Sequence, residues 1–133
     1  MKKFKLHFLC ADECEYMGEC VSITVPLIDG LAGILADHAN MVSIMTIGDL
    51  LIDTGTEVLE YAVSEGLVQI ENGNVLILAF SAERPDEIDE KRAEQAAQEA
   101  RMALQRKRSK LEYRQAQADL SRAMNRLKVK HRG

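Results

Sequence analysis

The sequence predicts an α+β protein in which an N-terminal antiparallel β-sandwich precedes a C-terminal hairpin of two antiparallel helices. Short apolar runs bounded by turn residues recur through the first part of the chain, whereas apolar residues recur at helical spacing after Pro85. The balance of charge also changes along the chain. Before Asp86 there are thirteen acidic and four basic residues, and from Ala100 onward there are two acidic and eleven basic residues. We therefore assign residues 1–84 to a β-sandwich domain and residues 85–133 to a helical arm.

The composition narrows the class of protein further. With 133 residues, 47% of them hydrophobic, the chain is long and apolar enough to bury a core. No apolar run approaches the roughly 20 residues of a membrane-spanning helix, and a strand pattern begins at once, without a signal peptide. The 5% aromatic content, with no Trp, argues against a platform for stacked bases. We expect a soluble protein of the cytoplasm.

The expected strands are short and closely spaced, which is typical of a sandwich or barrel. The segment 75–80 is apolar on both faces and is therefore expected to be central. Asn72-Gly73 predicts a hairpin, because both positions of the tight turn require positive φ, and residues 53–56 predict another. Residues 12–18 are expected to turn and residues 31–40 to be irregular. The expected strands are 3–10, 20–25, 41–47, 50–53, 58–63, 67–70 and 75–80.

Two helices of about 16–18 residues each are expected in the arm. Asp86 or Asp89 can cap the first helix, whose acidic first turn suits the helix dipole. Ser109 and Glu112 have the spacing of a capping box and predict the start of the second. The expected apolar stripes are Ala93, Ala96, Ala97, Ala100 and Leu104 on the first helix, and Tyr113, Ala116, Leu120, Ala123, Met124 and Leu127 on the second.

This hairpin is expected to be weakly stabilised and movable. Alanine side chains bury little area, at about 25 cal/mol per Å², and the basic residues of the second helix repel one another. A ligand or partner can therefore shift the equilibrium between folded and opened forms.

The cysteines and the loop histidine offer chemistry that we set aside. Cys10, Cys14 and Cys20, with His7 or His38, could form a metal site, but they lack the close pairwise spacing that zinc sites use. We interpret them as small apolar side chains, and His38 as a surface or packing residue. The sequence offers no nucleophile–base pair and no glycine-rich phosphate loop, so we do not expect an enzyme.

Three segments together resemble the epsilon subunit of the bacterial F-type rotary ATP synthase. Gly33–Met41 (GILADHANM) resembles that family's Gly-Ile-Leu-Pro-Gly-His-Ala-Pro loop, although Ala36-Asp37 replaces Pro-Gly. Tyr61–Ile70 resembles its Tyr-Ile-Ala-Val-Ser-Gly-Gly-Phe strand pair, with Glu65 at a usual glycine. Ile88–Ala93 matches its Ile-Asp-x-x-Arg-Ala motif. The resemblance covers essentially the whole chain in order.

The resemblance implies a non-catalytic subunit of the central stalk. Its sandwich would contact the gamma subunit and the ring of c subunits, and thereby couple rotation of that ring to the catalytic head. Its arm would rise along the shaft, meet the beta (and alpha) subunits and inhibit ATP hydrolysis. The location implied is the cytoplasmic face of the bacterial cell membrane, peripheral and attached only through the complex.

The resemblance also implies a regulatory ATP on the folded hairpin, although no cofactor is required. Arg122 and Arg126, four residues apart, could hold the phosphates with Arg92, since they share one helical face. The adenine would contact the residues of the motif, Ile88, Asp89 and Ala93. Asp89 could equally cap the helix. Related chains that bind ATP well carry a basic residue seven positions beyond Arg92, where this chain has Glu99, so we expect weak binding.

Two alternatives remain from the residues themselves. The basic arm could bind nucleic acid, although Tyr113 is the one aromatic residue among its basic residues and the body is acidic. It could also serve an adaptor that binds partners through the alanine stripe. We favour the interpretation as a subunit of the rotary ATP synthase, and we expect no nucleic-acid partner.

Overall fold

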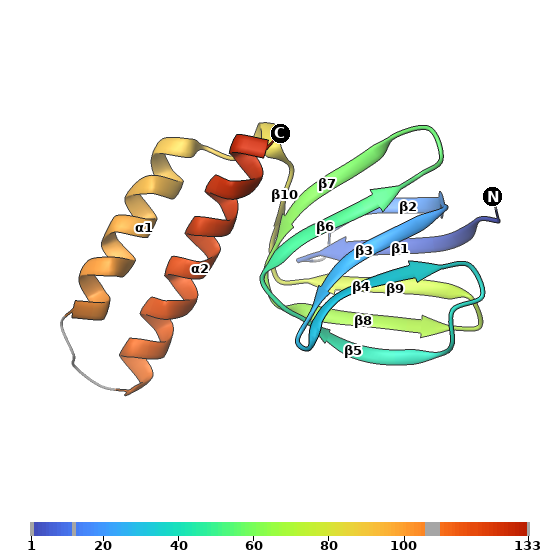
Figure 1. The fold of residues 1–133 in the computed structure, drawn as a ribbon, viewed down its shortest axis with the longest axis horizontal. Coiled ribbons are helices and arrows are strands. Elements are labelled where there is room, and N and C mark those ends of the chain that lie inside the picture. The colour runs from blue at the N-terminus through green and yellow to red at the C-terminus, as the bar shows by residue number, and fades with distance from the viewer. Residues whose placement is uncertain (1, 12, 106–109, 133) are drawn as a thin grey trace. The chain divides into compact units, whose positions relative to one another are not determined.

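The computed structural model describes residues 2–11, 13–105 and 110–132. The chain divides into two compact units, Met1–Glu83 and Arg84–Gly133, of which the first consists of β-strands and the second of helices (Figure 1).

The strands of the first unit form one continuous hydrogen-bonded sheet. In it they follow the order β10-β7-β6-β3-β5-β8-β9-β1-β2, and β4 pairs with β3. Among the described strands, the pairs are antiparallel except for β1 and β9, which run parallel with Lys5 opposite Asn74. The bounds are β1 Phe4–Cys10, β2 Glu13–Cys20, β3 Ser22–Leu27, β4 Gly30–Leu35, β5 Met41–Met45, β6 Gly48–Asp53, β7 Val58–Val63, β8 Gly66–Glu71, β9 Asn74–Ala79 and β10 Ala82–Glu83.

This sheet folds over itself into a sandwich with a single hydrophobic core (Figure 1). Phe8 of β1 and Tyr61 of β7 come from strands far apart in the sheet order. Their rings nevertheless meet edge to face, with centroids 5.1 Å apart, because both side chains point into the core. The β-sandwich prediction is confirmed, with the parallel β1–β9 pair as its one departure from an antiparallel arrangement among these strands.

Both predicted hairpins are present. Asn72 and Gly73 have φ values of 51° and 80°, as the tight turn between β8 and β9 requires. Between β6 and β7, the Asp53 Oδ1 atom accepts a hydrogen bond from the Gly55 N–H at 2.9 Å. The segment 75–80 contains most of β9, which is central as predicted, between β8 and β1.

Two expectations about irregular segments are wrong. Residues 12–18 fall largely within β2, and the first half of 31–40 belongs to β4. Each of these strands pairs on one side, β2 with β1 and β4 with β3. Such strands tolerate polar residues and glycine, so the alternation that marks a half-buried strand is weak in them.

The second unit is an antiparallel pair of helices (Figure 1). A 3₁₀ turn, η1 (Pro85–Glu87), precedes α1 (Glu90–Gln105) and α2 (Lys110–Arg132). With 23 residues, α2 is longer than predicted. We call the buried alanines between the helices the alanine seam. It consists of Ala93, Ala97 and Ala100 of α1 and Ala116 and Ala123 of α2.

The stripe predicted for α2 is only partly correct. Tyr113 and Met124 are each 44% exposed, whereas Val129, which lies off the predicted stripe, is buried. Ser109 of the expected capping box lies outside the described residues. Within the described chain, no helix is both long and apolar enough to span a membrane.

Candidate functional site

The residues expected to contact a nucleotide begin at the start of α1. Asp89 caps this helix, since its Oδ1 atom accepts a hydrogen bond from the Arg92 N–H at 3.2 Å. The Arg92 side chain is exposed, whereas Ile88 and Ala93 are each 3% exposed. In this conformation Ile88 and Ala93 therefore contribute to packing rather than to an open surface.

The two arginines expected to hold phosphates lie one turn apart on α2. The Arg122 Nη1 atom donates to Asp119 Oδ1 at 3.2 Å, and the same oxygen accepts from Gln115 Nε2 at 3.1 Å. Arg126 is half-buried. The guanidinium of Arg122 is thus held by a carboxylate of its own helix.

One contact fixes the register of the two antiparallel helices. His131 Nε2 lies 2.5 Å from Glu90 Oε1, so these two residues are at the same height. Because the helices are antiparallel, counting nine residues forward from Glu90 and nine back from His131 puts Glu99 level with Arg122. By the same count Arg92 lies roughly 5 Å along the axis from Arg126 and roughly 10 Å from Arg122.

This register brings Arg92 and Arg126 to similar heights and places an acidic side chain at the height of Arg122. Glu99 is exposed and accepts a hydrogen bond from Gln95 at 3.5 Å. A phosphate group held near Arg122 would meet the charge of that carboxylate. The nucleotide set therefore stays a prediction, and the geometry favours weak binding.

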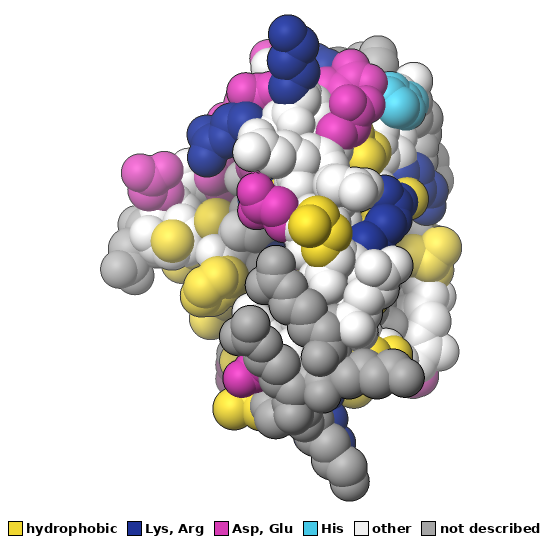
Figure 2. Space-filling view, turned by 90° about the vertical axis from the view of Figure 1, so that its left-hand side faces the viewer, with side chains coloured by type: hydrophobic (Ala, Val, Ile, Leu, Met, Phe, Trp, Pro, Cys, Tyr) yellow, Lys and Arg dark blue, Asp and Glu magenta, His cyan; other side chains and the backbone are white. Residues whose placement is uncertain are grey.

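The sequence also predicted a basic surface on α2. Arg114 and Lys128 are exposed, and Arg126 is half-buried. On the face of the molecule drawn in Figure 2, Lys and Arg side chains lie interspersed with Asp and Glu side chains. The described part of the arm thus presents mixed charge with a basic excess on α2.

A further candidate surface lies on the sandwich, and sequence reasoning missed it. Leucines and an isoleucine stand opposite one another across four neighbouring strands, with Ile44 paired to Leu67, Leu67 to Leu78, and Leu78 to Leu9. Although β9 is central, Leu78 is 39% exposed, and Leu67 and Ile44 are more exposed still. We call these four residues the outer row. The feature of the sequence that could have indicated the outer row is the apolar character of both faces of β9.

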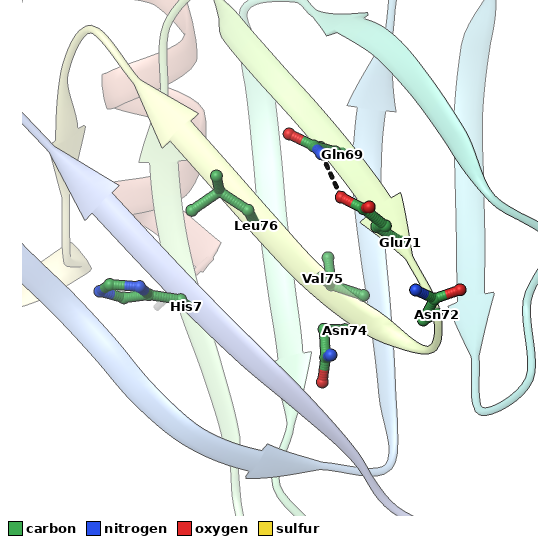
Figure 3. Close-up of a pocket in the computed structure, with 7 residues that line it drawn as sticks. All are labelled: His7, Gln69, Glu71, Asn72, Asn74, Val75 and Leu76. Atoms are coloured by element: carbon green, nitrogen blue, oxygen red, sulfur yellow. Dashed lines mark hydrogen bonds between the residues drawn. The ribbon is translucent and has the colours of Figure 1, made fainter.

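Beside the outer row lies a polar hollow of about 340 Å³ (Figure 3). His7 of β1, Leu76 of β9 and Gln69 of β8 form the next cross-strand row within it. Gln69 Nε2 donates to Glu71 Oε2 at 3.0 Å, and Asn74 adds a further amide. The hollow thus supplies hydrogen-bonding groups next to an apolar surface, an arrangement typical of the edge of a protein interface.

The cysteines do not come together. Cys20 is buried in the core, where burial, and next the charge of Asp53, raise its pKa to about 11. Burial, and next Glu15, also raise the pKa of Cys10. Both thiols therefore stay protonated and unreactive near neutral pH. Among the described residues, no three His, Cys, Asp or Glu side chains are placed to hold a metal ion.

Comparison with known proteins divides the chain within two residues of the boundary between its two units. Residues 3–85 match the family model of the β-sandwich domain of the ATP synthase delta/epsilon chain, and residues 86–130 match that of its long α-helix domain. The ATP synthase epsilon chain of Ruminiclostridium cellulolyticum is 39% identical over 99% of this chain and 98% of its own length. That of Desulforamulus reducens is 33% identical over 96% and 97%.

Solved structures agree on the fold. A chain in the cryo-EM structure of the Euglena gracilis mitochondrial ATP synthase, OSCP/F1/c-ring, superposes with a TM-score of 0.82 at 25% identity. The match covers 92% of this chain and 78% of that one. A chain of the Tetrahymena thermophila central stalk and c-ring matches in fold, with a TM-score of 0.74 at 15% identity and 95% of each chain covered.

Proposed function

The chain belongs to the ATP synthase delta/epsilon chain family, as an epsilon subunit of the F-type central stalk, and from this premise we propose a non-catalytic rotor subunit whose arm regulates ATP hydrolysis. The observation that carries the proposal is the division of the molecule. An acidic sandwich with an exposed apolar surface is joined to a helical unit with a basic second helix and an interface of alanines. The sandwich is suited to permanent attachment to the complex, and the helical unit is suited to contacts that form only when the hairpin opens.

The sandwich offers two apolar surfaces for two partners. One is the outer row with the polar hollow beside it. The other is the β3–β4 hairpin, where Ile28, Leu31 and Leu35 are exposed, Leu31 by 74%. Exposed apolar patches of this kind mark protein interfaces. We assign the two surfaces to the gamma subunit and the c-ring, which together would hold the subunit at the cytoplasmic face of the membrane through the complex.

The arm supplies the regulation. Its basic second helix would bind acidic segments of the beta and alpha subunits when the hairpin opens, and binding there would block hydrolysis. Attraction between opposite charges speeds association and is screened by salt, so inhibition should weaken as ionic strength rises. A regulatory ATP held by Arg92, Arg122 and Arg126 would favour the folded hairpin, since it would bind that form alone.

The test is the ATPase activity of the assembled catalytic head carrying this chain, either at full length or ending at Arg84. We expect the truncated form to assemble and to hydrolyse ATP faster, because the inhibitory helices are gone. Equal rates for the two forms would refute a regulatory arm. If the full-length chain fails to join the head, the rotor role itself is contradicted.

A further inference from the structure

The last turn of α2 is tied to the start of the helical unit by two polar contacts. His131 Nε2 lies 2.5 Å from Glu90 Oε1, and Lys130 Nζ donates to the Pro85 carbonyl oxygen at 3.2 Å. Glu90 is the first residue of α1, and Pro85 belongs to η1. Two consecutive side chains of α2 thus hold both elements that open the unit.

These contacts lie where the helix dipoles favour them. The N-terminus of a helix attracts negative charge and the C-terminus attracts positive charge. Glu90 is the first residue of α1, at its N-terminus, and His131 lies in the last turn of α2, at its C-terminus. The antiparallel arrangement brings these two helix ends together (Figure 1). When His131 is protonated, the ion pair is supported by the backbone of both helices.

Elsewhere the helical unit buries the alanine seam together with Val129, and Arg101 Nη2 of α1 donates to Met124 Sδ of α2 at 3.3 Å. Each member of the alanine seam contributes one methyl group, so the seam itself resists separation weakly. The contacts at the end of the hairpin therefore add to the stability of the folded form beside a seam that contributes little.

We propose that His131, Glu90 and Lys130 form a proton-sensitive latch that keeps the hairpin folded and releases it as His131 loses its charge. Histidine is the side chain that changes charge between pH 5 and 8. The latch should be tighter at pH 6 than at pH 8. Its role in regulating hydrolysis rests on the proposed function, whereas the latch itself does not.

Other charges surround this end of the hairpin and must be separated from the effect. Among the described residues, the charged side chains near this end are Arg84, Asp86 and Glu87 in and before η1, Asp89, Glu90, Lys91, Arg92 and Glu94 around the start of α1, and Arg126, Lys128 and Lys130 of α2. Carboxylates, ammonium groups and guanidinium groups as classes keep their charge between pH 6 and 8, so histidine is the residue type here that can confer a change in that interval.

The test is hydrogen exchange of the backbone amides of α1 in the full-length chain at pH 6 and pH 8, corrected for the intrinsic exchange rates. Both members of the His131–Glu90 pair are largely exposed, at 62% and 44%, so the expected effects are modest. We expect opening to increase about two- to fivefold from pH 6 to pH 8. Glu90→Gln should open the hairpin at pH 6 and abolish this pH dependence, and Lys130→Ala should increase opening at both values.

Two further variants complete the experiment. His131→Lys keeps a permanent charge and should hold the latch at both pH values. Arg114→Ala removes a basic side chain of α2 away from the latch and should leave opening unchanged. A pH dependence that persists in Glu90→Gln would overturn the proposal, and so would Arg114→Ala opening the hairpin as much as Lys130→Ala.

The same variants in the assembled head separate this inference from the proposed function. If Glu90→Gln increases exchange and strengthens inhibition of hydrolysis, both stand. If it increases exchange without changing hydrolysis, the latch is supported and the regulatory role of the arm is contradicted. Unchanged exchange refutes the latch whatever the hydrolysis rate.

Discussion

Replacing Gly66 by alanine should unfold the sandwich under conditions where the wild type is stable. Gly66 begins β8 and stands opposite Ala79 of β9. A Cβ atom added there would lie 1.9 Å from the carbonyl oxygen of Leu78 and 3.0 Å from the Cα atom of Ala79. Both neighbours are backbone atoms of the paired strand, so no side chain can rotate away.

The magnitude follows from how far the strands must move. A Cβ atom needs at least 3.0 Å from the carbonyl oxygen, so the two backbones must separate by more than 1 Å. Such a movement lengthens the ladder hydrogen bonds beside Gly66, at about 1 kcal/mol each, and adds about 1–3 kcal/mol of overpacking strain. We expect a loss of about 3–5 kcal/mol, a large part of the roughly 5–15 kcal/mol that stabilises a domain.

The measurement is urea unfolding of the full-length chain, followed through the amide resonances of the sandwich so that the arm does not contribute. Gly33→Ala is the matched control, since a Cβ atom at Gly33 in β4 would meet no heavy atom within 4 Å. We expect it to change stability by less than about 0.5 kcal/mol. A loss below 1 kcal/mol for Gly66→Ala, or equal losses for the two variants, would refute the steric argument.

Two further predictions concern charge. Because the pKa of Cys20 is raised from 9.0 to about 11, the folded chain keeps this proton to higher pH than the unfolded chain, and stability should fall as pH rises from about 9 to 11. The wild type should lose about 2–3 kcal/mol more than Cys20→Ala over that interval in urea unfolding, and parallel curves would contradict this cause. For the nucleotide, Glu99→Arg should strengthen ATP binding about tenfold in calorimetric titration, because it reverses the charge level with Arg122. Glu94→Arg, the same charge change about 140° around α1 from Glu99, should not strengthen binding as much. Equal gains for the two variants, or submicromolar affinity in the wild type, would refute the role of Glu99.

Much of the sandwich could be predicted because its hairpins are local. Asn72-Gly73 specifies its turn through positive φ at both positions, whatever the rest of the chain does. Sequence reasoning missed three strands, β2, β4 and the two-residue β10, and each owes its conformation to one neighbouring strand. Their side chains do not alternate between apolar and polar, and the residue types of a strand do not indicate which other strand its backbone pairs with. The parallel pairing of β1 with β9 was invisible for the same reason.

The helical unit shows a different limit. The alanine seam and the cap at Asp89 were predictable, since helical spacing and capping chemistry act within a few residues. The contact between Glu90 and His131 joins residues 41 positions apart. Its prediction needs the length of α2 and the register of two helices, and neither follows from local pattern. The height of Glu99 relative to Arg122 became clear only from that register.

The parallel pairing of β1 with β9 has a consequence for how the chain folds while it is synthesised on the ribosome. Lys5 finds its partner Asn74 only after almost the whole sandwich has been synthesised. Contacts so distant in sequence slow folding, because a long loop must close before they form. Until then β1 can pair on one side only, with β2, and its other edge is open to wrong partners. The sandwich is complete at Glu83, before any residue of the arm is needed, so the helices emerge beside a body that can already have folded.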